Sequence, residues 1–245
     1  MPARNTLRLK SRPKASPAPS PPCGKRIFSE VAVPLLDDID PPAKLAGACN
    51  TLLKTSGGWK GYNTDGFGLE KAVEHSLGRE IKGSDIVIIG AGGAARAAAF
   101  HALSRGCRSL IILNRGAERL GKLSSDIRGA GFECEAHLLG EKFACPPSPV
   151  IINATSVGLK EGDPPCADFS AFPPSAAFFD MPYAAGRETP STLAARARGM
   201  RACGGLAMLA WQGAKSLSIW TAKPLMGELM LKTLNGAEKW QPSNK

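Results

Sequence analysis

Apolar residues in this chain form short uninterrupted runs that alternate with longer amphipathic stretches. The runs at 86–89 and 110–113 are bounded by polar or glycine residues, which is typical of parallel strands buried on both faces. The same pattern predicts further strands at 150–153 and 176–180, and helices at 67–77, 94–104, 117–128, 190–198 and 207–233. Because strands alternate with helices, we expect an α/β fold with a doubly wound parallel sheet.

The glycine-rich turn after the first of these buried runs predicts a nucleotide site. It has the pattern G-x-G-x-x-A at Gly90, Gly92 and Ala95, between a predicted strand and a predicted helix. The glycines allow a tight turn and a close approach of the backbone to a pyrophosphate, which helix N-terminal amides can bind. Glycines with a purely structural role are the alternative. The predicted phosphate-binding residues are Gly90, Ala91, Gly92, Gly93 and Ala94.

Residues that follow the second buried run favour NADP over NAD. NAD-binding units usually place an acidic residue there for the ribose 2′-hydroxyl, whereas this chain has Asn114 and Arg115, with Arg119 four residues later. Guanidinium groups pair with a 2′-phosphate that a carboxylate would repel. Ordinary solvated arginines are the alternative. We therefore predict an NADP-binding, Rossmann-like unit.

The net charge of +10 is concentrated in the N-terminal tail. Residues 1–29 hold seven basic residues, no acidic residue and six prolines, so the rest of the chain carries a net charge of only +3. We expect residues 1–30 to be a disordered basic tail. An organellar transit peptide is a weaker alternative to a cytoplasmic location. A nucleic-acid-binding arm is disfavoured because no aromatic residue precedes Phe28. No apolar run is long enough for a membrane span.

Several short motifs occur in an order that resembles shikimate dehydrogenase. Together they extend from residue 31 to about residue 235. They are PLLDDID at 34–40, GACNT at 47–51, YNTDG at 62–66, the glycine turn, Asn114-Arg115, INATSVG at 152–158, DMPY at 180–183 and GLAMLAWQ at 205–212.

The resemblance implies reversible hydride transfer between NADPH and 3-dehydroshikimate, which gives shikimate. It assigns substrate hydroxyls to Asn50 and Gln212, the reacting hydroxyl to Asp65, and a position near the substrate to Tyr183. It places Asn153, Thr155, Ser156, Gly205 and Met208 at the nicotinamide end of the cofactor. Structural roles remain open: Asn50 in a turn, Asp65 as a helix cap and Gln212 on a solvated helix face.

Two features of the family's substrate domain have no counterpart in this sequence. One is a serine-containing loop that binds the substrate carboxylate, and the other is a Thr-x-Pro-x-Lys strand. The place of that lysine falls on Ser29. Aspartate alone is ionised at neutral pH and is a poor proton donor, so we expect impaired catalysis. The abrupt change from basic tail to family sequence suggests a truncated or frame-shifted reading, or a degraded copy of the gene.

We expect residues 31–80 to be the remainder of a substrate-binding domain and residues 81–206 to be the NADP-binding domain. Residues 207–245 would form C-terminal helices that pack back on the substrate domain. The chain would be a monomer or a homodimer with a small-molecule substrate, and without a nucleic-acid, membrane or metal partner. The alternatives to a shikimate dehydrogenase are a non-catalytic NADP-binding remnant and a quinate/shikimate dehydrogenase.

Overall fold

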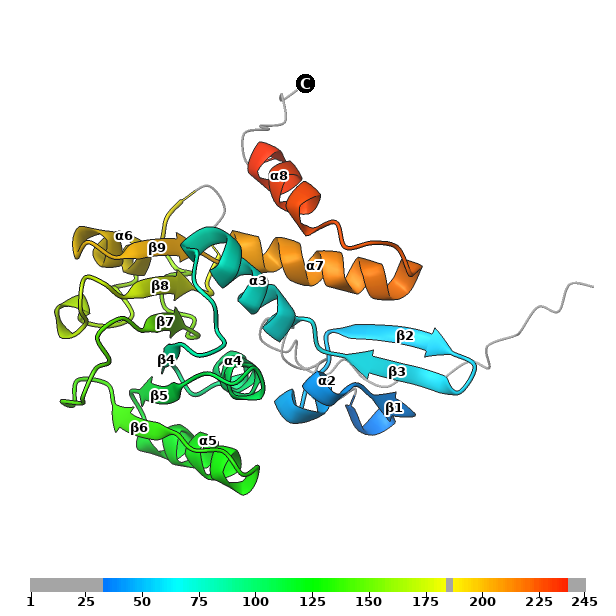
Figure 1. Cartoon of the computed structure of the whole chain (residues 1–245), viewed down its shortest axis with the longest axis horizontal. Coiled ribbons are helices and arrows are strands. Elements are labelled where there is room, and N and C mark those ends of the chain that lie inside the picture. The colour runs from blue at the N-terminus through cyan, green and yellow to red at the C-terminus, as the bar shows by residue number, and fades with distance from the viewer. Residues whose placement is uncertain (1–32, 184–186, 238–245) are drawn as a thin grey trace, which may run out of the picture.

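The computed structural model describes residues 33–183 and 187–237 (Figure 1). The predicted basic tail and Ser29 lie outside these ranges. Within them the chain forms two β-sheets that are joined by long helices. No helix in the described ranges is long and apolar enough to cross a membrane.

The larger sheet has six parallel strands, and it confirms the predicted fold class. Its spatial order is β6 (Glu135–Leu138), β5 (Ser109–Asn114), β4 (Asp85–Ile89), β7 (Val150–Asn153), β8 (Ala177–Asp180) and β9 (Arg201–Gly204). Sequential strands therefore run outward from β4 to one edge, and then from β7 to the other edge. This is the doubly wound order of dinucleotide-binding sheets, and its switch point lies between β4 and β7.

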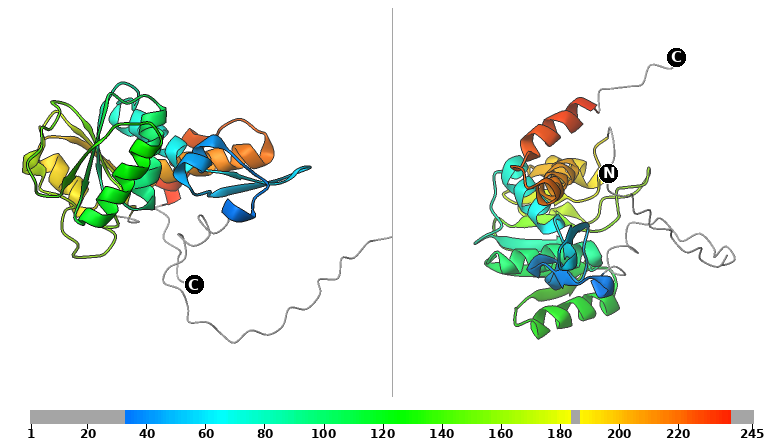
Figure 2. Two further views of the ribbon diagram at one scale, coloured as in Figure 1. Left: turned by 90° about the horizontal axis from the view of Figure 1, so that it is seen from below. Right: turned by 90° about the vertical axis from the view of Figure 1, so that its right-hand side faces the viewer.

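Helices and loops cover both faces of this sheet (Figure 2). Ile86 and Ile88 of β4 pack with α3 (Asp65–Leu77), α4 (Gly93–Ser104), α5 (Ala117–Gly129) and α7 (Leu206–Thr221). Val87 and Ile89 belong to a second core with α6 (Pro190–Ala197) and the aromatic residues around η2 (Phe169–Ala171). Consecutive residues of β4 thus face different cores, which explains its uninterrupted apolar sequence.

The smaller sheet lies beside the large one and has the order β1 (Asp38–Ile39), β3 (Gly58–Tyr62) and β2 (Thr51–Thr55) (Figure 1). β2 and β3 form an antiparallel hairpin whose turn contains Gly57 and Gly58. The backbone of Gly58 has a φ of +121°, which favours glycine at that position. η1 (Val33–Leu35) precedes this sheet, and α2 (Pro41–Ala46) connects β1 to β2.

The single helix predicted at 207–233 is wrong, because the structure has two helices there. α7 ends at Thr221 and α8 (Gly227–Ala237) begins after a break. Ala222 adopts a left-handed φ of 55°, and Pro224 lacks the backbone N–H that a continuing helix needs. The short elements α2, β6 and β9 were not predicted.

α3 and α7 pack along each other and connect the two sheets (Figure 1). Leu69, Val73 and Leu77 of α3 are fully buried within the core of the large sheet. At the other end of the pair, Trp220 of α7 donates a hydrogen bond from Nε1 to the carbonyl oxygen of Leu52 on β2, over 2.8 Å. The first turn of α3 is therefore held between the small sheet and α7.

Candidate functional site

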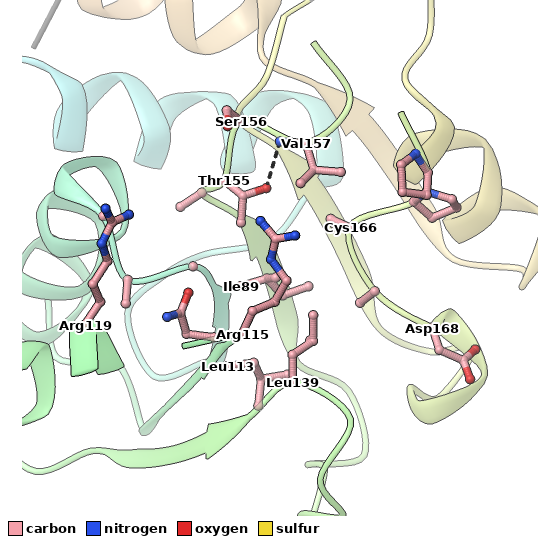
Figure 3. Close-up of a pocket in the computed structure, with 18 residues that line it drawn as sticks. Ile89, Leu113, Arg115, Arg119, Leu139, Thr155, Ser156, Val157, Cys166 and Asp168 are labelled. Atoms are coloured by element: carbon pink, nitrogen blue, oxygen red, sulfur yellow. Dashed lines mark hydrogen bonds between the residues drawn. The ribbon is translucent and has the colours of Figure 1, made fainter. Parts of the chain in front are cut away.

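A cavity of about 390 Å³ opens at the carboxyl ends of the central strands of the large sheet (Figure 3). Its walls come from the turn after β4, the end of β5, the loop after β7 and the segment 164–168. Ligands of doubly wound sheets bind at this switch point. Eight of the predicted cofactor residues line the cavity: Gly90, Ala91, Gly92, Asn114, Arg115, Arg119, Thr155 and Ser156.

The turn between β4 and α4 has the geometry that the glycine pattern predicts. Gly90 has a φ of +120°, and a Cβ added there would lie 3.1 Å from the carbonyl oxygen of Ala154. Its N–H donates a hydrogen bond to the carbonyl of Leu113 over 2.7 Å, which fixes the turn against β5. α4 begins at Gly93, and Gly93 and Ala94 in its first turn are exposed. The N-terminal amides of α4 are thus placed to bind an anion.

Arg115 and Arg119 extend into the opening of the cavity from the end of β5 and the start of α5, opposite the loop that carries Thr155 and Ser156 (Figure 3). Both side chains are exposed. Neither forms an ion pair with any carboxylate in the described ranges. Asn114 donates a hydrogen bond from Nδ2 to the carbonyl of Gly116 over 2.8 Å. The two guanidinium groups are therefore available to an anionic ligand.

Asn153 does not line the cavity but shapes the loop that does. It is fully buried, and its Oδ1 accepts hydrogen bonds from the backbone N–H and from Oγ1 of Thr155, over 3.0 and 2.7 Å. Its Nδ2 donates to Oδ1 of Asp180 over 2.7 Å. The other oxygen of Asp180 accepts hydrogen bonds from the hydroxyls of Thr189 and Thr192. Burial raises the pKa of Asp180 above its ordinary value, despite these donors.

The predicted substrate residues Asn50 and Asp65 meet at the junction of the small sheet and α3. Nδ2 of Asn50 donates to Oδ1 of Asp65 over 2.8 Å. Oδ1 of Asn50 accepts from the backbone N–H of Thr64 and from the hydroxyls of Thr64 and Thr51, at 3.0 to 3.1 Å. The N–H of Asp65 donates to Oδ1 of Asn63 over 3.0 Å. An amide and a carboxylate are the kinds of group that bind ligand hydroxyls, and the fold brings one of each together here.

Gln212 lies on α7, where that helix comes closest to α3. A Cβ at Gly68 would lie 2.9 Å both from Cβ of Gln212 and from the carbonyl oxygen of Met208, so the contact requires glycine. Ser216, one turn after Gln212, has its hydroxyl 2.6 Å from that of Thr51 and 3.2 Å from that of Thr64. α7 is thereby connected to the hydrogen bonds that orient Asn50.

Known proteins are similar to this chain both in sequence and in fold. The sequence model of the family described as Shikimate / quinate 5-dehydrogenase matches residues 71–157. A shikimate dehydrogenase (NADP(+)) of Moorella thermoacetica is 36% identical over 215 residues, which cover 85% of this chain and 72% of that relative. The chain belongs to the shikimate dehydrogenase family. The predicted family is confirmed, and with it the enzyme class of NADP-dependent oxidoreductases that act on a CH–OH group.

Solved structures of family members, and of proteins with similar structures, share this fold. The shikimate 5-dehydrogenase of Thermus thermophilus, solved with NADP(H) and shikimate, is 31% identical with a TM-score of 0.71, over 86% of this chain and 76% of that one. A 5-ketofructose reductase of a Gluconobacter species is 30% identical with a TM-score of 0.75, over the same shares of the two chains. The shikimate dehydrogenase fold is thus shared with a protein named for another substrate.

The other three residues that the family resemblance assigned to the site lie outside the lining of the cavity. Gly205 is buried at the start of α7 against the carbonyl oxygen of Met181, where a Cβ would not fit. Met208 is also buried on α7 and belongs to the core of the large sheet. Tyr183 follows β8 and is half-buried. None of the three is among the residues that line the cavity.

The side chain of Asn50 is surrounded by a cluster of hydroxyl groups from Thr51, Thr64 and Ser216. These three residues were not predicted from the sequence. Thr51 and Thr64 lie inside the quoted motifs, but no spacing rule connects them with Ser216, which is 152 residues beyond Thr64. No group of three or more metal-binding side chains occurs in the part of the chain that the structure describes.

Proposed function

We propose that this chain binds NADP(H) in the cavity at the switch point and catalyses the reversible reduction of 3-dehydroshikimate to shikimate. The observation that carries this proposal is the presence of Arg115 and Arg119, both without an acidic partner in the described ranges, at the opening of a cavity bordered by Gly90 and Gly92. Two cations suit a 2′-phosphate at that place, and the N terminus of α4 suits the pyrophosphate.

NADPH supplies the hydride when it is bound. The residues of the chain bind and orient the two reactants. Thr155, held by Asn153, and Ser156 border the cofactor cavity. We assign the ring hydroxyls of the substrate to Asn50 and Gln212, and the reacting hydroxyl to Asp65. We also assign Tyr183 to the neighbourhood of the substrate, and Gly205 and Met208 to the nicotinamide end of the cofactor.

Ser29 occupies the sequence place at which the family has a lysine. A lysine beside Asp65 would donate a hydrogen bond or a proton to the substrate oxygen. Loss of one general acid–base group typically lowers the rate by roughly 10²- to 10⁴-fold. We therefore expect slow turnover in a chain whose NADPH affinity is intact.

The test is NADPH-dependent reduction of 3-dehydroshikimate by the full chain, followed by the loss of NADPH absorbance and by chromatography of the product. We expect shikimate in an amount equal to the NADPH consumed. NADPH consumption without shikimate would contradict the proposal, and so would the same rate in a variant that lacks the carboxylate of Asp65.

A non-catalytic NADP-binding protein is the second candidate, and Ser29 is the observation that favours it. This candidate predicts NADPH binding without product under any substrate concentration. Quinate should be tested beside shikimate with NADP+, and 5-ketofructose beside 3-dehydroshikimate with NADPH, since a 5-ketofructose reductase shares the fold at a TM-score of 0.75. Preference for quinate over shikimate, or for 5-ketofructose over 3-dehydroshikimate, would replace the proposed substrate.

A further inference from the structure

α4 is in contact with both functional regions of the chain. Its first turn follows the glycine turn of the cofactor cavity. Its last turn packs against α3, whose first residue is Asp65. A rigid helix between the two regions can set the position of one relative to the other.

Glu70 of α3 connects the two helices through both of its carboxylate oxygens. Nε2 of His101 lies 3.0 Å from Oε2, and Nε of Arg105 donates to Oε1 over 2.8 Å. Only 7% of the surface of Glu70 is exposed, whereas the side chain of Arg105 is 51% exposed, so the contact is buried at the carboxylate and open to solvent at the guanidinium. Bonds to a charged and buried acceptor are stronger than neutral ones at a surface.

The ring of His101 also covers the residue next to Asp65. A Cβ added to Gly66 would lie 2.5 Å from Nδ1 of His101, so glycine allows the ring to contact the backbone of the first turn. Gly66 and Glu70 are four residues apart and share one face of α3. His101 therefore packs on the same face at which it binds Glu70.

His101 can donate to Glu70 in the tautomer that carries the proton on Nε2. Burial lowers the pKa of His101 below 6.5 although the neighbouring carboxylate of Glu70 acts in the opposite direction. The neutral ring can still bond Glu70, because a carboxylate only accepts and Nε2 can carry the proton. The connection thus does not require a charged imidazole.

We propose that Glu70, bound by His101 and Arg105, is a positioning residue that sets the first turn of α3, and with it Asp65, relative to the cofactor-binding helix α4. This inference rests on the proposed function for the role of Asp65. It predicts that weakening the contact loosens the first turn of α3 while the cofactor cavity stays intact.

Amide hydrogen exchange of the full chain without ligand tests the positioning itself. Glu70→Gln keeps the volume of the side chain. An amide has only one acceptor oxygen, so glutamine cannot accept from His101 and Arg105 through two oxygens as the carboxylate does. We expect the amides at 68–71, which bond to the carbonyls of the first turn of α3, to exchange about tenfold faster in this variant. The matched control is Asp85→Asn. Asp85 accepts from Ser109 and Arg108 at the start of β4, over 2.8 and 3.1 Å. Equal exchange at 68–71 in wild type and Glu70→Gln would overturn the proposal.

Kinetics test the consequence for the reaction. Glu70→Gln should lower kcat about tenfold and leave the Kd of NADPH unchanged. His101→Gln, which retains a donor, should preserve more activity than His101→Ala. An unchanged kcat in Glu70→Gln, or equal activity in His101→Gln and His101→Ala, would overturn the proposal. If the wild type forms no shikimate, the proposed function fails, and the exchange experiment still decides the positioning role.

Discussion

The amide of Asn50 donates a hydrogen bond to the carboxylate of Asp65 over 2.8 Å, across 15 residues of sequence. The bond joins the entry to β2 with the start of α3. Asn50 and Asp65, which the family resemblance assigns to the same substrate, are thus in direct contact.

Replacing Asp65 with Asn should lower kcat for 3-dehydroshikimate reduction by roughly 10²- to 10⁴-fold and leave the Kd of NADPH unchanged. The reason is that Asp65 lies outside the set of cavity-lining residues. Steady-state kinetics and a cofactor titration measure the two effects separately. Glu118→Gln, which alters an exposed acid in the first turn of α5, is the control and should retain wild-type kinetics.

Replacing Arg115 with Ala should weaken NADPH binding about tenfold and change NADH binding little. Bonds from a guanidinium to a phosphate are charge-assisted, and NADH lacks the 2′-phosphate. Arg119→Ala should act in the same direction. Arg128→Ala, in the last turn of α5, is a control outside the cavity lining. Equal losses for the two cofactors would remove the case for 2′-phosphate recognition.

Replacing Gly90 with Ala should abolish tight NADPH binding and destabilise the fold by about 1–3 kcal/mol. The φ of +120° disfavours any side chain, and the new Cβ would lie 3.1 Å from the carbonyl oxygen of Ala154. Gly121→Ala is the matched control. Gly121 lies within α5 with no atom within 4 Å of an added Cβ, so this change should stabilise by about 0.5–1 kcal/mol. Chemical denaturation measures both effects.

The central strands and most helices could be predicted because burial on both faces requires continuous apolar runs. β6 and β9 were missed since they lie at the two edges of the large sheet and are only partly buried. The break between α7 and α8 was missed although Pro224 lies in it. Apolar residues continue through the break as Leu225 and Met226 and mask the interruption.

The cofactor cavity could be predicted because most of its predicted residues directly follow one of the strands β4, β5 and β7. Parallel strands bring their carboxyl ends to the same edge of the sheet. The contact between Asn50 and Asp65 was expected only from the family resemblance. Ser216, Glu70 and His101 could not be found in this way. Each is an ordinary helix residue whose partner depends on how α3, α4 and α7 pack.

Asp180 and Asp163 should affect the pH dependence of stability with opposite signs. Burial raises the folded-state pKa of Asp180, so wild type should lose stability relative to Asp180→Asn as pH rises from 3.8 through the raised pKa. Backbone N–H groups of Lys160 and Gly158 lower the pKa of Asp163. Its contribution is present above 3.8 and is lost as pH falls through the lowered pKa. Denaturation of wild type, Asp180→Asn and Asp163→Asn over a pH series measures both, and differences of the same sign would contradict the assignment.

The most direct test of the cofactor site, on which the account depends, is fluorescence titration of the full chain with NADPH and with NADH under identical conditions. We expect saturable binding of NADPH, with a lower Kd than for NADH. No binding of NADPH at millimolar concentration would contradict both the active-enzyme proposal and the non-catalytic alternative.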